Sequence, residues 1–265
     1  VDKDRKAELF LLGEDMYAYC YSNTGELKWK SENVFDNRYL LSVADVNNDG
    51  EAELVCGRYI YNAKTGKLLI NATLENDGKG FMSPHNLHVD KDGINTMSNA
   101  FYMYALANFN YDNNLEMAAG NTLYKIVLTN NEGTEGNSMT VLRQAKLNDK
   151  VDVVDGGSIV LDFDNDGDLD ICTFAKEVDG GSLDNHKINI YVWEGQSSDL
   201  IAYQTIESSF RGPTIPFCAD INGDKHPEII FNTANGMNVL YYDLMAENSM
   251  SLKVVPDYKE SAAYT

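Results

Sequence analysis

An acidic stretch followed by a short apolar run recurs along the chain and constrains its fold more than any other feature. The clearest copy is LDFDNDGDLDICTF at residues 161–174. Related copies are ADVNNDGEAELVCG at 44–57, ANFNYDNNLEMAAG at 107–120 and ADINGDKHPEIIFN at 219–232. The opening VDKDRKAELFLLG at 1–13 fits the same frame without its leading position. Repetition with this long period is typical of proteins built from copies of one supersecondary unit.

Each copy is predicted to be a small antiparallel sheet. An apolar run precedes the acidic stretch, and a strand-like run of four or five residues follows it, as at 53–56. Further strand-like runs are separated by tight turns, in which Gly25 and Gly66 are expected to adopt a positive φ. No segment keeps a helical apolar stripe for three turns, so we predict an all-β fold.

The repeat length distinguishes between all-β architectures. Three or four strands per 45 to 60 residues is expected of a β-propeller blade, and the long regular period disfavours the alternative, a β-sandwich. We therefore predict that residues 1–265 form a single β-propeller domain of about five repeats.

Composition excludes several partners. The formal net charge of −20 disfavours binding to nucleic acid or to an anionic lipid surface. No apolar stretch of about 18 residues is present, which predicts no direct membrane insertion. The four cysteines are widely spaced in apolar runs, so we expect buried free thiols.

The acidic stretches predict calcium sites. In the copy at 161–174 a strand would place five aspartates on one face, where like charges repel, so a loop around a cation is expected. Counted from Asp162, positions 1, 3 and 5 offer side-chain oxygens, position 6 is Gly167, and position 9 is Asp170. This is the start of an EF-hand loop, although a strand follows it instead of a helix. Oxygen-only ligands favour Ca²⁺ over zinc or copper, and Mg²⁺ is disfavoured because it keeps several waters and demands a tighter octahedron. The alternative is an Asx-rich turn without metal.

The same positions in four copies give the predicted metal ligands. They are Asp45, Asn47, Asp49, Glu53, Asn108, Asn110, Asp112, Glu116, Asp162, Asp164, Asp166, Asp168, Asp170, Asp220, Asn222, Asp224 and Glu228. Asn113 and Lys225 replace the glycine in two of these copies, and Asn tolerates the left-handed conformation better than Lys. The opening copy offers Asp2, Asp4 and Glu8 but has Arg5 at the glycine position.

The motif apolar-D-x-(D/N)-x-D-G-x-x-(D/E)-apolar-apolar resembles the FG-GAP/VCBS repeats, best known from the integrin α propeller. The resemblance implies calcium-loop hairpins that join the first two strands of each blade. The Phe-Gly and Gly-Ala-Pro signatures are not intact here, so integrin ligand specificity does not transfer. Propellers of this family commonly have about seven blades, which suggests a piece of a longer secreted protein. The alternative is a small propeller closed by a strand after Leu252.

Weak calcium sites suit millimolar extracellular calcium, so we expect a secreted or cell-surface protein. The main functional hypothesis is a non-enzymatic adhesion module that binds an extracellular protein or glycan. Recognition or blade packing would use Trp29, Tyr39, Arg58, Tyr59 and Trp193. The alternative is a polysaccharide lyase similar to rhamnogalacturonan lyases, which would use Arg58, His85, His88 and Arg211. A purely architectural spacer is a third possibility.

Overall fold

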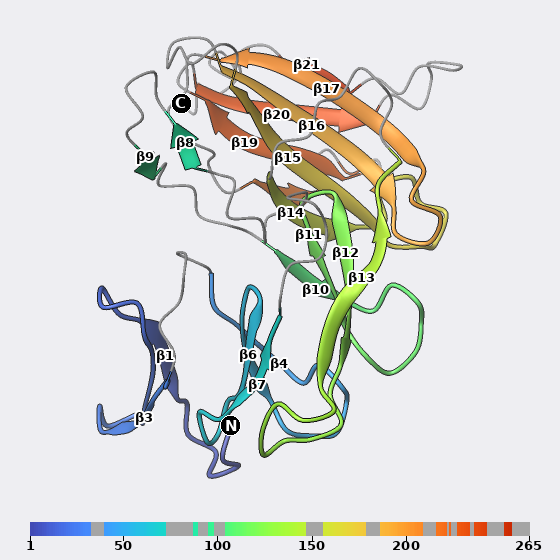
Figure 1. Ribbon diagram of the computed structural model, residues 1–265. Helices are drawn as coiled ribbons and strands as arrows, with labels where there is room; N and C mark the ends of the chain where they lie inside the picture. The colour runs from blue at the N-terminus through green and yellow to red at the C-terminus, as the bar shows by residue number, and fades with distance from the viewer. Residues whose placement is uncertain are drawn as a thin grey trace. The chain divides into compact units, whose positions relative to one another are not determined.

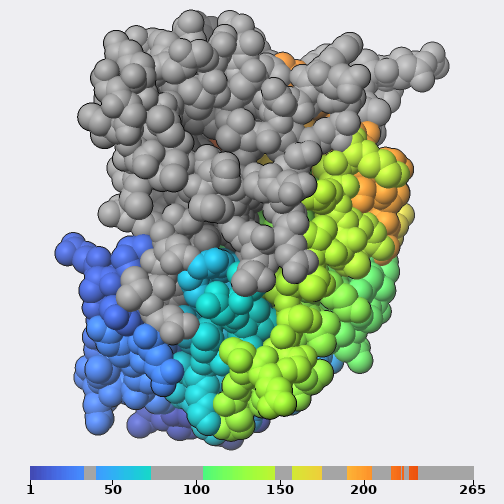
Figure 2. Space-filling view, viewed as in Figure 1, coloured from blue at the N-terminus to red at the C-terminus, as the bar shows by residue number. Residues whose placement is uncertain are grey.

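The computed structural model describes most of the chain. The described residues are 1–32, 40–72, 87–89, 95–97, 104–146, 156–178, 186–208, 216–221, 223, 227–233, 236–242 and 252–255. They are drawn as coloured ribbon in Figure 1, and those whose side chains are also described are coloured in Figure 2. Within these residues every regular element is a strand, which confirms the predicted all-β fold.

The strands form a series of sheets in the order of the sequence. The first sheet contains β1 (Leu9–Leu12), β2 (Ala18–Tyr21) and β3 (Leu27–Lys30). The second contains β4 (Ser42–Ala44), β5 (Glu53–Cys56), β6 (Tyr59–Asn62) and β7 (Leu68–Asn71). A two-stranded sheet pairs β8 (Leu87–Val89) with β9 (Asn95–Met97).

Three four-stranded sheets follow. The third consists of β10 (Ala105–Ala107), β11 (Glu116–Ala119), β12 (Thr122–Val127) and β13 (Ser138–Gln144). The fourth consists of β14 (Gly156–Leu161), β15 (Asp170–Val178), β16 (His186–Glu194) and β17 (Leu200–Ser208). The fifth consists of β18 (Phe217–Ala219), β19 (Glu228–Thr233), β20 (Gly236–Tyr242) and β21 (Leu252–Val255). In each four-stranded sheet consecutive strands are neighbours, and the acidic stretch of the repeat lies between the first and second strands in the sequence.

The C-terminal strand corrects one expectation. Residues Leu252–Val255 do not add to another sheet but form the outer strand of the fifth, with Val255 opposite Val239 and Leu252 opposite Tyr242. The hypothesis that this segment closes a ring is therefore wrong for these residues. The apolar run LKVV finds its partner in the strand that immediately precedes it among the described strands, which is the usual short connection.

Contacts between Cα atoms divide the chain into two compact units. One consists of Val1–Glu75, Leu106–Met117 and Tyr124–Leu142, and the other of Asn76–Ala105, Ala118–Leu123 and Arg143–Thr265. In the first unit, the Trp29 indole N–H donates to the carbonyl of Ala63 at 3.0 Å and the ring covers Gly66. A Cβ on Gly66 would lie 2.6 Å from that ring, so the turn requires glycine for space as well as for its φ of 74°. Gly25 also has a positive φ, of 84°, so both turn predictions are confirmed.

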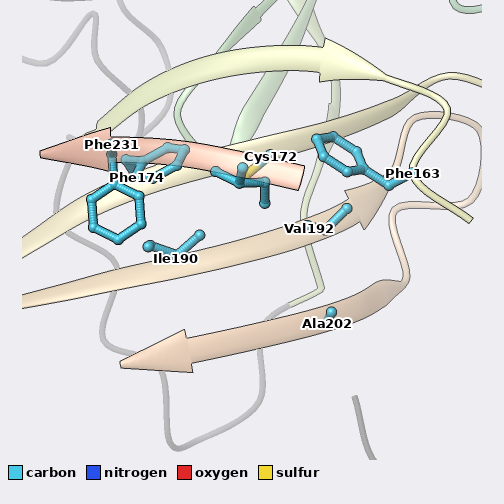
Figure 3. Packing of buried hydrophobic residues seen from close by; sticks show 8 residues of the cluster. Phe163, Cys172, Phe174, Ile190, Val192, Ala202 and Phe231 are labelled. Carbon is cyan, nitrogen blue, oxygen red and sulfur yellow. The ribbon is translucent and has the colours of Figure 1, made fainter. Parts of the chain in front are cut away.

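In the second unit, the fourth and fifth sheets share an apolar core. Figure 3 shows Phe163, Cys172, Phe174, Ile190, Val192, Ala202 and Phe231 gathered between strands. The rings of Phe174 and Phe231, one from each sheet, meet edge to face with centroids 5.7 Å apart. Packed aromatic pairs of this kind stabilise the contact between two sheets through burial as well as through ring geometry.

The cysteines follow the prediction. Cys20, Cys56 and Cys172 are buried free thiols, and Cys218 is a free thiol that is half-buried against the core shown in Figure 3. Burial raises the pKa of the Cys20 thiol, which keeps it protonated at neutral pH. Among the described residues there is no helix of the length and apolarity needed to cross a membrane.

Candidate metal centres

The final acid of each acidic loop is buried, and one of its oxygens closes the loop. Glu53, Glu116, Asp170 and Glu228 are each at most 3% exposed. Each accepts a hydrogen bond from the backbone N–H of the second loop residue. The N–O distances are 2.9 Å from Val46, 3.0 Å from Phe109, 2.8 Å from Phe163 and 2.9 Å from Ile221. We call this contact the loop clasp. It gives the last acid of each loop a structural role, which explains why this acid recurs in every copy.

Left-handed residues bend the loops at two positions. Gly50 and Gly167 have φ values of 85° and 98°, as predicted for position 6. Position 4 is left-handed in all four loops, with φ of 55° at Asn48, 57° at Tyr111, 60° at Asn165 and 80° at Gly223. In the loop at Asn108, Asn113 does not have a positive φ, so Tyr111 makes the bend there. Sequence analysis missed position 4, although Asn or Gly occupies it in three of the four loops.

The loop at Asp162 gathers its carboxylates around one point. One carboxylate oxygen from each of Asp162, Asp164 and Asp166 lies within 4.8 Å of the other two. Asp162 Oδ2 accepts from the N–H of Gly167 at 3.1 Å, and Asp164 Oδ1 accepts from the N–H of Asp166 at 3.2 Å. These are the Asx-type bonds of the metal-free alternative, but they use only part of the oxygens. Asp162 Oδ1 and Asp170 Oδ1 are buried without a hydrogen-bond partner.

The loop at Asp45 has the same construction with fewer charges. Both oxygens of Asp45 accept backbone bonds, from Asp49 at 3.0 Å and Gly50 at 2.8 Å. Asp49 Oδ2 accepts from the side-chain amide of Asn47 at 3.0 Å. The Asn47 Oδ1 and Glu53 Oε1 atoms are buried without a hydrogen-bond partner.

The remaining two loops are less charged or only partly described. In the loop at Asn108, Asn110 donates its amide to Glu116 Oε1 at 2.8 Å and accepts from the N–H of Asp112 at 2.9 Å. Asn108 Oδ1 is buried without a hydrogen-bond partner. In the loop at Asp220, Asp220 Oδ1 accepts from Gly223 N–H at 2.6 Å. The predicted ligands Asn222 and Asp224 lie outside the described residues.

The unpartnered oxygens test whether these loops fit a cation. The five loop oxygens named above are buried and have no hydrogen-bond partner. All five belong to positions 1, 3 or 9, which are ligand positions of the sequence pattern. A buried oxygen without a donor costs free energy, and a hard cation would satisfy it. The donor set therefore fits Ca²⁺.

The pKa values of the loop acids show the same imbalance of charge. Burial, with the charges of Asp49 and Asp45 adding to it, raises the pKa of Glu53 to about 7. Burial also raises the pKa of Asp170, and the carboxylates of Glu194 and Asp164 raise it further. The pKa of Asp164 is raised mainly by burial and then by Asp166. These carboxylates are poorly compensated as anions and would be stabilised by a proton or a metal ion.

Glu194 is a carboxylate at this site that sequence reasoning missed. It ends β16 and lies directly opposite Asp170 in the antiparallel register. Its own pKa is raised by burial and by the charges of Asp164 and Asp166. No motif surrounds it, since its position depends on strand pairing 24 residues away in sequence.

The opening loop contrasts with the others because a lysine supplies positive charge. Carboxylate oxygens of Asp2, Asp4 and Glu8 cluster within 4.8 Å, and the Lys28 ammonium lies 2.5 Å from Asp2 and 3.4 Å from Glu8. The hydrogen bond from Lys28 lowers the pKa of Asp2. Among the described residues, no lysine or arginine forms an ion pair with the acids Asp45, Asp49, Glu53, Asp162, Asp164, Asp166 or Asp170.

The aromatic residues considered for recognition are packed inside the sheets. Trp29 is 9% exposed, Tyr59 3% and Trp193 0%, so the recognition role is wrong for these three and the packing alternative holds. Trp193 donates its indole N–H to the Thr173 hydroxyl at 3.2 Å. Arg58 stacks on the Tyr59 ring and donates to its hydroxyl at 2.6 Å.

None of the other residues considered for recognition or lyase chemistry has a side chain that the structure describes. Tyr39, His85 and Arg211 lie outside the described residues. His88 lies in β8, where only the backbone is described.

Sheets of consecutive antiparallel strands with an acidic loop after the first strand define a class of repeat protein. Residues 162–231 match the family model of the FG-GAP-like repeat, so this part of the chain carries FG-GAP-like repeats, as its motif predicted. No curated protein sequence matches the chain.

Two solved structures are similar to the chain over 96% of its length. One is the crystal structure of the V. cholerae biofilm matrix protein Bap1, with 15% identity and a TM-score of 0.49. This chain spans 40% of the Bap1 chain. The other is the crystal structure of BBS1N in complex with ARL6DN, with 9% identity, a TM-score of 0.36 and coverage of 79% of that chain. At these levels of similarity neither protein's role transfers to this chain.

Proposed function

We propose that the chain is a calcium-stabilised module of FG-GAP-like blades, arranged as a β-propeller, that binds an extracellular protein or glycan. The observation that carries the metal assignment is the set of buried, unpartnered oxygens at ligand positions of the acidic loops. Among the described residues, five of the six sheets are each associated with one acidic loop, and this repetition supports the blade arrangement.

Calcium has a structural role in this proposal. Each ion would draw positions 1, 3, 5 and 9 of a loop together and compensate carboxylates that burial disfavours as anions. The loop joins the first two strands of its sheet, so the ion would hold that pair together at one end. Millimolar extracellular calcium is enough to fill sites of moderate affinity, which supports secretion or display on the cell surface.

Binding rather than catalysis is the favoured activity. Arg58, one of the residues considered for lyase chemistry, lies half-buried in the turn between β5 and β6, where it stacks on the Tyr59 ring and donates to its hydroxyl. A rigid β-scaffold that presents loops is a common arrangement for recognition. The net charge of −20 favours partners that are neutral, basic or bridged by calcium.

Calorimetric titration with Ca²⁺ and melting curves in calcium and in EDTA test the metal assignment. We expect three or four sites, a lower melting temperature in EDTA, and recovery with calcium but not with the same concentration of magnesium. An unchanged melting temperature would contradict the assignment. A glycan array and a pull-down, both with and without calcium, test the binding role. Growth of absorbance from unsaturated uronate on pectic polysaccharide would instead demonstrate lyase activity.

A further inference from the structure

We infer that Glu194 is an additional ligand of the cation at the Asp162 loop, so that this site binds calcium most tightly and links three strands. The inference rests on the proposed calcium function and concerns a residue outside the repeat motif. Asp162 follows β14, Asp170 begins β15, and Glu194 ends β16.

The register places Glu194 and Asp170 directly opposite each other, on the same face of the sheet. Residues directly opposite in antiparallel strands have their Cβ atoms about 5 Å apart and project on the same side. Asp170 and Glu194 form such a pair. Two carboxylates in this arrangement destabilise a sheet unless a positive charge lies between them.

Backbone contacts fix the end of β16 beside the loop. The N–H of Gly195, directly after Glu194, donates to the carbonyl of Leu169 at 3.2 Å, and Leu169 directly precedes Asp170. Glu194 itself donates to the carbonyl of Asp199 at 2.9 Å and accepts from the N–H of Ser198 at 2.9 Å. Its backbone is therefore held on both sides, and little ordering is needed to direct its carboxylate to a cation.

An unpartnered oxygen points to a ligand at this place. Asp170 is fully buried, and its Oδ1 atom has no hydrogen-bond partner although Oδ2 makes the loop clasp. Asp162 Oδ1 is a second buried oxygen without a hydrogen-bond partner. A cation bound to both oxygens would lie beside the strand position that carries Glu194.

In the second sheet, a neutral residue occupies the position that corresponds to Glu194. Asn62 lies opposite Glu53, the last acid of its loop. Its Oδ1 atom accepts from the N–H groups of Lys64 and Thr65, both at 3.0 Å, and so caps its own turn. The position is therefore neutral and already engaged in the second sheet, whereas the fourth sheet adds a carboxylate. Because calcium affinity rises with the charge of the ligand set, the Asp162 loop should be the tightest site.

The test is a calcium titration of the full chain by calorimetry, with melting curves in EDTA and in millimolar calcium. Glu194→Gln should weaken the tightest site about tenfold or more, the usual scale for loss of one metal-supporting group. It should raise the melting temperature in EDTA, because a repulsive charge is removed, and lower it in calcium. Glu194→Asp keeps the charge, so it should lose affinity without the increase in EDTA.

Asp199→Asn is the matched control, since it removes one charge from the same hairpin at an exposed residue paired with Lys146. It should leave the tightest site within about twofold of the wild type, as expected for an exposed charge. If Asp162→Asn abolishes the tightest site while Glu194→Gln leaves it unchanged, the role of Glu194 is refuted and the calcium proposal stands. If the wild-type chain binds no calcium, both fall together.

Discussion

Replacement of Glu53 with Gln should change the stability of the protein in opposite directions with and without calcium. Glu53 is fully buried, one of its oxygens accepts the N–H of Val46, and the other has no hydrogen-bond partner. Burial raises its pKa from 4.5 to about 7. A group whose folded pKa is raised in this way loses stability as the pH rises from the unfolded pKa to the folded one, because the folded state binds the additional proton.

The pKa sets the magnitude for the metal-free protein. A rise of this size corresponds to about 3 kcal/mol of unfavourable free energy for the ionised form at pH 8. Gln removes that charge and keeps an acceptor for Val46, but its buried amide nitrogen lacks a partner, which costs about 1 to 3 kcal/mol. The net expectation in EDTA at pH 8 is a stabilisation of about 1 kcal/mol, or roughly 3 °C in melting temperature. At pH 5 the penalty for the ionised form falls below about 1 kcal/mol, so the unpaired amide should make Glu53→Gln mildly destabilising.

In calcium the sign should reverse. Gln is a neutral and weaker ligand, so the affinity of the Asp45 loop should fall about tenfold or more and the gain from bound calcium should shrink. Circular dichroism melts of wild type, Glu53→Gln and the exposed control Glu51→Gln at both pH values, each in EDTA and in calcium, provide the measurement. A Glu53→Gln shift of the same sign and size in EDTA and calcium at pH 8 would refute the reasoning.

Three further predictions concern pH, backbone conformation and packing. In EDTA the free energy of unfolding should fall between about pH 5 and 8, because Glu53 and Asp170 have raised pKa values; saturating calcium should flatten the dependence, as urea titrations at several pH values would show. Gly167→Ala should cost about 1 kcal/mol through its φ of 98° alone, since a new Cβ meets no atom within 4 Å, whereas Gly133→Ala, equally open and without a positive φ, should change stability by less than about 0.5 kcal/mol. Phe231→Ala should cost about 3 kcal/mol or more by leaving a cavity beside Phe174; a much smaller loss in urea unfolding would contradict the shared core of the two sheets.

The local features of the repeat could be predicted because they depend on residues close in sequence. The alternation of acids, the glycine at position 6 and the apolar run after position 9 together define one loop and the strand after it. Gly50 and Gly167 adopt the expected left-handed conformation for this reason. The clasp between positions 2 and 9 could not be read from the pattern, since it pairs a carboxylate with a backbone N–H that every residue except proline carries.

Features that depend on pairing between distant segments were missed. Glu194 reaches the Asp162 loop only through the register of β15 and β16, which single-sequence reasoning does not supply. Similarly, Trp29 is a residue type common in recognition sites, but its indole N–H donates to the carbonyl of Ala63 in the turn after β6, and its ring lies against Gly66. An aromatic residue with one polar atom suits a buried position as well as an exposed one, so exposure had to come from the structure.

The loop clasp has a consequence for how an ion would enter. Val46, Phe109, Phe163 and Ile221 anchor the last acid of their loops through main-chain hydrogen bonds, and these bonds do not themselves require a cation. Capture of the ion then requires little additional ordering of the backbone, and its departure would leave repulsion among carboxylates rather than an unravelled turn. Such a protein would fold where free calcium is scarce and would gain stability, rather than a new loop conformation, once it reaches calcium-rich surroundings.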